Sequence, residues 1–109
     1  MKTVKLIVNG NNIKVDPSCN LSDLFPRMTE PVRLEFTLSP EWKNRVKVAA
    51  FWSMLGQEYP PRALNDGKSC IVPAEVLQRA AFRVQLLGKY NGEKVETTKC
   101  TIHLKGGSV

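Results

Sequence analysis

The chain has 109 residues, of which 42% are hydrophobic and 24% are charged, and its formal net charge is +6. This length predicts a single domain over residues 1–109, and the composition is ordinary for a globular protein, which argues against a disordered chain. The sequence contains no run of about 18 apolar residues, so we expect no membrane-spanning helix and no membrane partner.

The cysteines and the single histidine argue against a metal site. Cys19, Cys70 and Cys100 are widely spaced, no Cys-x-x-Cys motif occurs, and His103 is the only histidine. A zinc site needs clustered ligands. We therefore predict free thiols in a reducing compartment, with no metal and no cofactor. A disulfide between Cys70 and Cys100 is an open alternative, which no secretion signal supports.

The N-terminal part of the chain predicts a hairpin followed by a connection. Residues 3–8 alternate weakly between polar and apolar side chains, and Asn9-Gly10 is a strong hairpin signal, so we expect a hairpin over residues 1–16. Residues 17–31 contain three prolines and predict a connection with one helical turn. The apolar residues of that turn, which are expected to cover an open end of the core, are Leu21, Leu24 and Phe25.

Two strands are predicted in the middle of the chain. Val32–Leu38 alternates apolar and polar residues, the pattern of a half-buried strand, and a turn with Pro40 leads to a second strand over residues 45–54. One face of this second strand carries Val46, Val48, Ala50 and Trp52. We assign the opposite face, with Arg45, Lys47, Ala49, Phe51 and Ser53, to the outside.

The second half of the chain contains further strands around a corner. Pro60-Pro61 restricts residues 58–64 to an edge strand or a loop, and Asn65-Asp66-Gly67 is a turn signal. The run Cys70-Ile71-Val72 ends at Pro73, and residues 73–79 predict a short helical corner that carries the chain from one sheet to the other. Two more strands are expected over residues 82–90 and 94–104, separated by a tight turn, before a frayed end at residues 106–109.

The strand spacing predicts the fold class. Seven or eight short strands, at intervals of roughly 8–12 residues, are typical of an all-β antiparallel sandwich. We divide the domain into the N-terminal hairpin (residues 1–16), the Pro-rich connection (17–31) and the sandwich core (32–105). Inward-facing side chains are expected at Phe36 and at Phe82, Val84 and Leu86.

The sequence contains little that predicts catalysis. It has no Gly-rich phosphate loop and no Gly-x-Ser-x-Gly elbow. Its one histidine lies on the polar side of the last predicted strand, which argues against an acid–base pair. We therefore predict no catalytic residues and no enzyme. The aromatic residues Trp42, Phe51, Trp52 and Tyr59 are expected mainly to pack in the core and turns. The alternative is a contact patch formed by Arg45, Lys47 and Phe51, which would also suit single-stranded nucleic acid.

Several motifs between Thr37 and Gly107 point to a family. They are Leu38-Ser39-Pro40-Glu41-Trp42, Val46-x-Val48-x-Ala50-x-Trp52, Cys70-Ile71-Val72-Pro73-x-Glu75-Val76-Leu77 and Phe82-x-Val84-x-Leu86-x-Gly88. In these motifs the chain resembles small immunoglobulin-like modules of bacteriophage structural proteins, such as the N-terminal domain of baseplate upper proteins. The resemblance implies an immunoglobulin-like sandwich that binds other phage structural proteins or itself, as a tail, baseplate or capsid-associated component.

Two alternatives to a virion component stay open. A small phage-encoded module could inhibit a bacterial defence protein, as anti-CRISPR proteins do, by covering a surface of that protein. The third interpretation is a nucleic-acid-binding β-barrel. Of the two kinds of partner, we expect a protein rather than a nucleic acid. The resemblance places the protein in the virion or in the cytoplasm of the infected bacterium.

Overall fold

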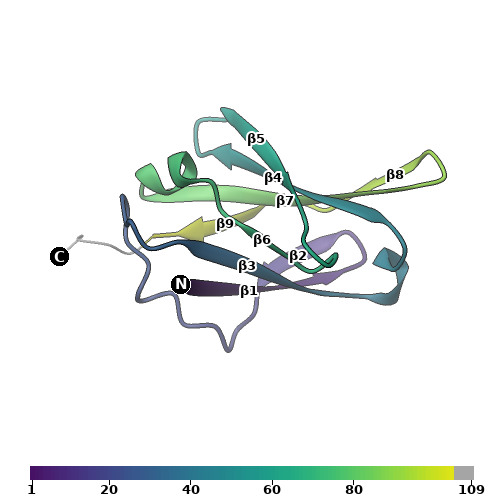
Figure 1. Ribbon diagram of the computed structural model, residues 1–109, viewed down its shortest axis with the longest axis horizontal. Coiled ribbons are helices and arrows are strands. Elements are labelled where there is room, and N and C mark those ends of the chain that lie inside the picture. Colours follow the sequence, from purple (N-terminus) through teal and green to yellow (C-terminus); the bar gives the residue numbers. More distant parts are fainter. Residues whose placement is uncertain (105–109) are drawn as a thin grey trace.

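Two β-sheets pack face to face and enclose a hydrophobic core (Figure 1). In a computed structural model of the protein, residues 1–104 are described. The first sheet contains, in spatial order, β2 (Asn12–Val15), β1 (Lys2–Asn9), β3 (Val32–Leu38) and β6 (Ser69–Ile71). The second sheet contains β5 (Glu58–Ala63), β4 (Val46–Ser53) and β7 (Ala81–Tyr90), with β8 (Glu93–Glu96) and β9 (Cys100–His103) both paired to β7. The predicted all-β sandwich is confirmed, whereas its immunoglobulin-like classification stays a prediction.

The predicted last strand is broken at Thr97 into β8 and β9. Thr97 is buried, and its hydroxyl Oγ1 accepts the N–H of Leu86 at 3.0 Å and donates to the carbonyl of Thr98 at 2.7 Å. A side chain that takes over a ladder hydrogen bond lets the strand bulge without leaving a buried donor unpaired. The part of the chain that is described therefore contains nine strands, where the sequence predicts seven or eight.

The N-terminal hairpin is a full member of the first sheet. β1 pairs antiparallel with β2 and parallel with β3, in a register that places Val4 beside Leu34. Both side chains are completely buried, so residues 1–16 contribute to the core that the sequence assigned to residues 32–105. The expectation of a purely antiparallel sandwich is wrong at this pair. A parallel pair requires a long crossover, and the connection over residues 17–31 supplies it.

The connection covers one end of the core with fewer residues than predicted. Leu24 is buried and Leu21 is partly buried, but Phe25 is 47% exposed, so its predicted role in the core is wrong. The segment forms a turn, with the Leu24 N–H bonded to the Leu21 carbonyl at 3.1 Å, in place of the predicted helical turn. Pro26 disfavours the helical conformation at Phe25, which accounts for this difference.

The predicted corner is confirmed, as a 3-10 helix. β6 ends before Pro73, which caps η2 (Ala74–Gln78), and the chain then enters β7 in the second sheet. Val76 and Leu77 of η2 are buried, and η2 lies against β4 and β7. Apolar side chains on a single helical turn therefore cover the end of the sandwich where the chain changes sheet.

The remaining expectations concern the inner faces, the turns and the thiols. Phe36, Phe82, Val84 and Leu86 are buried, as predicted. The turns after β5 and β7 are confirmed, with positive φ at residues 66, 67, 91 and 92. Cys19, Cys70 and Cys100 are free thiols. Residue 105 of the predicted core and the predicted frayed end at residues 106–109 lie outside the described residues.

Candidate functional site

The structure places Phe51 in the core, so the prediction that it lies on an outer contact surface is wrong. Its side chain is completely buried, and its ring centroid lies 6.2 Å from that of Phe82. The register explains the orientation, because Phe51 is directly opposite the inward-facing Val84 of β7. Side chains directly opposite each other in a sheet lie on the same face, so Phe51 must point inward.

The side chains of Arg45 and Lys47 leave β4 on the same side as Phe51. They lie at the end of the sandwich where β4 begins. The Nε of Arg45 donates to the carbonyl of Glu41 at 3.0 Å, and its Nη2 lies 3.4 Å from Oε1 of Glu93. The Nζ of Lys47 donates to the carbonyl of Arg45 at 3.0 Å, and burial lowers the pKa of Lys47. The two cations of the predicted patch are therefore held by local contacts at the margin of the core, and only 15% of the Arg45 side chain is exposed.

The outer face of β4 carries the side chains that the sequence assigned to the core. Val46, the first residue of β4, is 72% exposed, and Val48 and Trp52 are half-buried on the same face. Trp52 is covered at the far end by Lys99, whose Nζ lies 3.9 Å from the ring centroid. Val46 is open to solvent, and apolar side chains that are exposed side by side, unlike single ones, mark binding surfaces.

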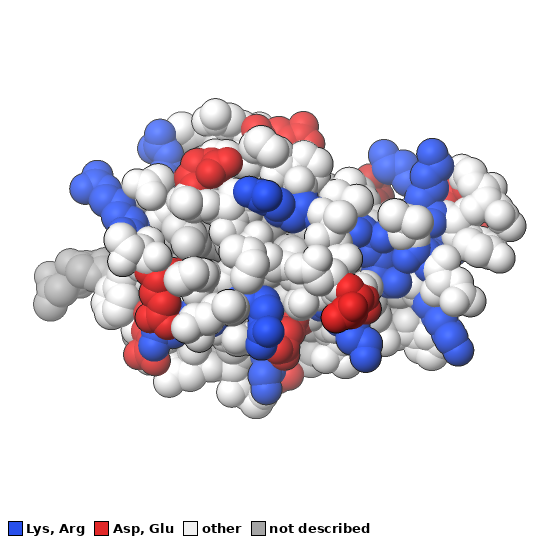
Figure 2. Space-filling model, viewed as in Figure 1, with Lys and Arg blue, Asp and Glu red and all other residues white. Residues whose placement is uncertain are grey.

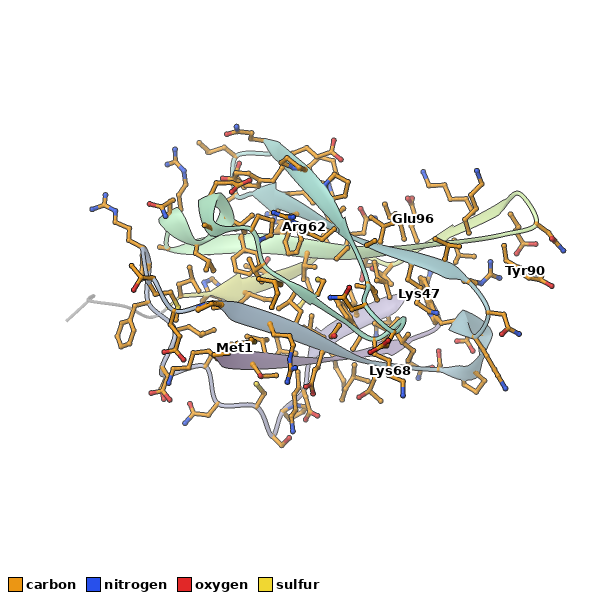
Figure 3. The ribbon with its side chains drawn as sticks, viewed as in Figure 1. Met1, Lys47, Arg62, Lys68, Tyr90 and Glu96 are labelled. Atoms are coloured by element: carbon orange, nitrogen blue, oxygen red, sulfur yellow. The ribbon has the colours of Figure 1, made fainter. Side chains whose placement is uncertain are left out.

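An open groove lies beside Val46 on this outer face. It has a volume of about 680 Å³ and is bounded by β4 and by the β7–β8 hairpin, which projects beyond the sandwich in Figure 1. It is lined by the apolar residues Val46, Val48 and Leu87, by Lys89 and Lys94, and by Tyr90, whose side chain leaves the other face of the hairpin together with that of its partner Glu93. We call the six lining residues the hairpin groove. Tyr90 is 51% exposed and lies toward the tip of the hairpin (Figure 3).

The two lysines of the hairpin groove face each other across the hairpin. Lys89 of β7 is directly opposite Lys94 of β8, and Val46 of β4 is opposite Lys89 on the other side. Like charges directly opposite each other destabilise a sheet. None of the ion pairs within residues 1–104 includes Lys89 or Lys94. The groove therefore combines an apolar floor with two positive charges that form no ion pair within residues 1–104.

More basic residues lie at the same end of the molecule. Figure 2 shows Lys and Arg side chains gathered at the right end, over the hairpin and the start of β4. A second groove at this end, next to η1 (Pro40–Trp42), is lined by Lys43, Lys47 and Lys68, and Asp66 is its single acidic side chain. This arrangement attracts anionic groups to the end that carries the hairpin groove.

The sequence contained a signal for the hairpin groove. The outer residues of β4 alternate with Ala49 and Phe51, so both faces carry apolar side chains and the alternation does not reveal which face is buried. The clearer pattern of β7 assigns Phe82, Val84 and Leu86 to the core and therefore leaves Leu87 and Lys89 outside. Pairing β4 with β7 in the observed register would have placed Val46 and Val48 beside them.

The side chains that could carry chemistry are the potential metal ligands, His103 and the cysteine thiols. No group of three or more His, Cys, Asp and Glu side chains among residues 1–104 is close enough to hold a metal ion. His103 is exposed on the outer face of β9, as predicted. Burial raises the pKa values of the Cys70 and Cys100 thiols, which keeps both thiols protonated and poorly nucleophilic.

Comparisons with known proteins leave the family undetermined. No protein-family model matches the sequence, and no curated protein is significantly similar to it. None of the helices within the described range is long and apolar enough to cross a membrane. The geometry of the chain itself is therefore the basis for its proposed function.

Proposed function

We propose that the protein is a non-enzymatic binding module that docks on a partner protein through the hairpin groove. The observation that carries this proposal is the 72% exposure of Val46 at the margin of a groove lined by Val48, Leu87 and Tyr90. Transfer of apolar surface from water into an interface is favourable, at about 25 cal/mol per Å². Apolar and aromatic side chains at the centre of a patch are also the usual anchors of protein interfaces.

The scaffold supports such a role because the groove lies on regular strands. β4 and β7 pair continuously from Val46 opposite Lys89 to Ser53 opposite Phe82, and their inner faces are packed into the core. A site on paired strands keeps its geometry without a partner, so binding has a smaller ordering cost than at a flexible loop.

The proposed partner is another structural protein of a bacteriophage. This part of the proposal rests on the resemblance of motifs such as Val46-x-Val48-x-Ala50-x-Trp52 to phage baseplate modules. Stable co-assembly with tail or capsid proteins supports it. A 1:1 complex with a bacterial defence protein would favour the inhibitor reading, and the same groove would then cover a surface of that protein.

The test compares two outward-facing apolar residues on different sheets. Tagged protein captures its partner from infected cells, and the partner is then purified and titrated against the Val46→Glu and Ile71→Glu variants. Ile71 is a matched control because it is a β-branched residue, 40% exposed, on the opposite sheet. We expect Val46→Glu to weaken binding by about tenfold or more, as loss of an interface anchor does, and Ile71→Glu to leave it within about twofold. Equal affinity of both variants for the purified partner would contradict the proposed site.

A further inference from the structure

We infer that the hairpin groove binds an acidic segment of the partner protein, in which carboxylates flank an apolar anchor. This inference rests on the proposed function and adds the chemistry of the ligand. Its observations are the directly opposed lysines at positions 89 and 94 and the apolar floor beside them.

The hairpin brings the two lysines as close as a sheet allows. The β7–β8 turn consists of Asn91 and Gly92, so Tyr90 and Glu93 form the pair that flanks a two-residue turn. In such hairpins the flanking pair is hydrogen-bonded and the next pair is not, and the Cα atoms of a non-hydrogen-bonded pair are only about 4.5 Å apart. Lys89 and Lys94 form that next pair, and their side chains leave the same face. Their mutual repulsion is relieved when a carboxylate binds between them.

The nearby carboxylates form no ion pair with these two lysines. Glu93 is engaged by Arg45 on the inner side of the sheet. Glu96 lies on the outer face, one row further along β8 and opposite Leu87, and it forms no ion pair within the described part of the chain (Figure 3). A carboxylate supplied by a partner therefore meets two ammonium groups that form no ion pair within the described residues.

The apolar floor decides between the classes of anionic partner. Val46, Val48 and Leu87 occupy adjacent positions across β4 and β7, where an aliphatic or aromatic side chain can be buried. Single-stranded nucleic acid is held by several stacking aromatic side chains along a cationic path, and Tyr90 is the single aromatic residue of this groove. An acidic peptide with an apolar residue at its centre fits both features.

A second copy of the chain fits the hairpin groove less well than an acidic peptide does. If two copies associated through this face about a two-fold axis, the same surface would meet itself. Lys89 and Lys94 of one copy would then approach the identical lysines of the other, in proteins that each carry a net charge of +6. Like-charge contacts of this kind disfavour association.

The experiment uses synthetic peptides and the intact protein in nuclear magnetic resonance titrations. The test peptide has the sequence Glu-Glu-Leu-Trp-Glu-Glu. One control peptide replaces the glutamates with lysines, and another replaces Leu-Trp with Gly-Ser. An oligothymidylate of the same net charge as the test peptide tests the nucleic-acid reading. Size-exclusion chromatography of the unliganded protein tests for a second copy.

Two charge-reversal variants supply the matched comparison. The first is Lys89→Glu with Lys94→Glu. The second is Lys5→Glu with Lys14→Glu, which changes the net charge equally but alters exposed residues on the first sheet. Any effect of total charge appears in both variants, whereas an effect of the opposed lysines appears only in the first.

We expect the test peptide to shift the amide resonances of Val46, Leu87 and Lys89 and to bind at least about tenfold more tightly than either control peptide. The first double variant should lose about tenfold in affinity and the second less than about twofold, and binding should weaken with added salt. A test peptide that does not bind, or binds no better than the lysine peptide, overturns the inference. Tighter binding of the oligothymidylate, or a dimer that occludes the groove, also overturns it. In each of these cases the proposed function has its own test. It is still supported if the Val46→Glu variant no longer binds the partner captured from infected cells.

Discussion

The indole ring of Trp42 lies against Gly88 so closely that a Cβ atom at position 88 would be 2.7 Å from Cζ3 of Trp42. Trp42 is buried, and its Nε1–H donates to the carbonyl of Gly10 at 2.8 Å. The ring thus connects η1 to the β1–β2 turn and supports β7 from inside, directly behind Leu87 and Lys89 of the hairpin groove. Only a residue without a side chain allows this contact.

Replacement of Gly88 by alanine should therefore destabilise the protein. The added methyl group must displace the Trp42 ring, and overpacking of this kind costs about 1–3 kcal/mol. Urea denaturation of Gly88→Ala measures the change in free energy of unfolding. The same substitution in a Trp42→Leu background is the control, because the smaller side chain removes the clash. An equal cost of Gly88→Ala in both backgrounds would show that the ring contact is not the cause.

Two phenylalanines provide a test of the core. Phe36 is 4% exposed on the inner face of β3, whereas Phe25 is 47% exposed in the connection between β2 and β3. Phe36→Ala should lower the free energy of unfolding by about 3–5 kcal/mol, as large-to-small substitutions in cores do. Phe25→Ala should change it by about 0.5 kcal/mol or less, as surface substitutions do. Similar melting temperatures for the two variants would contradict the assigned burial.

The break between β8 and β9 depends on the hydroxyl of Thr97. Thr97→Val keeps the shape of the side chain but leaves the buried N–H of Leu86 without the acceptor that it has at 3.0 Å. An unsatisfied buried donor costs about 1–3 kcal/mol, so we expect Thr97→Val to be destabilised by that amount in chemical denaturation. Thr97→Ser retains the acceptor and should lose less stability. The hydroxyl has no such role if valine is tolerated better than serine.

Cys70 makes the stability depend on pH in the alkaline range. Burial raises the pKa of its thiol from 9.0 to about 11, so the folded protein keeps this proton at pH values where the unfolded chain releases it. This contribution to stability is complete below pH 9.0 and is lost as the pH rises from 9.0 through about 11.

The measurement for Cys70 compares pH profiles of unfolding free energy. Cys100→Ser serves as the background, because burial also raises the pKa of Cys100. We expect the additional Cys70→Ala substitution to reduce the decline in stability between pH 9 and pH 11. The other groups titrate in both proteins, so the difference in slope belongs to Cys70. Parallel profiles would mean that the thiol ionises equally in the folded and unfolded states.

The sequence alone determined most of the β-strands and most of the turns. Val32–Leu38 and Phe82–Leu86 alternate so cleanly that only one face of each strand can be buried, and the structure buries that face. Gly10, in the turn between Asn9 and Asn12, and Asn91-Gly92 fixed two hairpins, because few other residues adopt positive φ at low cost. Pro73 and the apolar residues that follow it fixed the corner. These features depend on local conformational preferences, which a sequence displays directly.

Only the tertiary structure decided which face of β4 became the hairpin groove. Both faces of this strand carry apolar side chains, so its own alternation is ambiguous, and a shift of one residue in pairing exchanges the two faces. The register with β7 placed Phe51 against Val84 in the core and left Val46 beside Lys89 outside. The parallel pairing of β1 with β3, the exposure of Phe25 and the contact of Trp42 with Gly88 were equally absent from local patterns. Each depends on how segments distant in the sequence pack together, and that is settled by the free energy of the whole core.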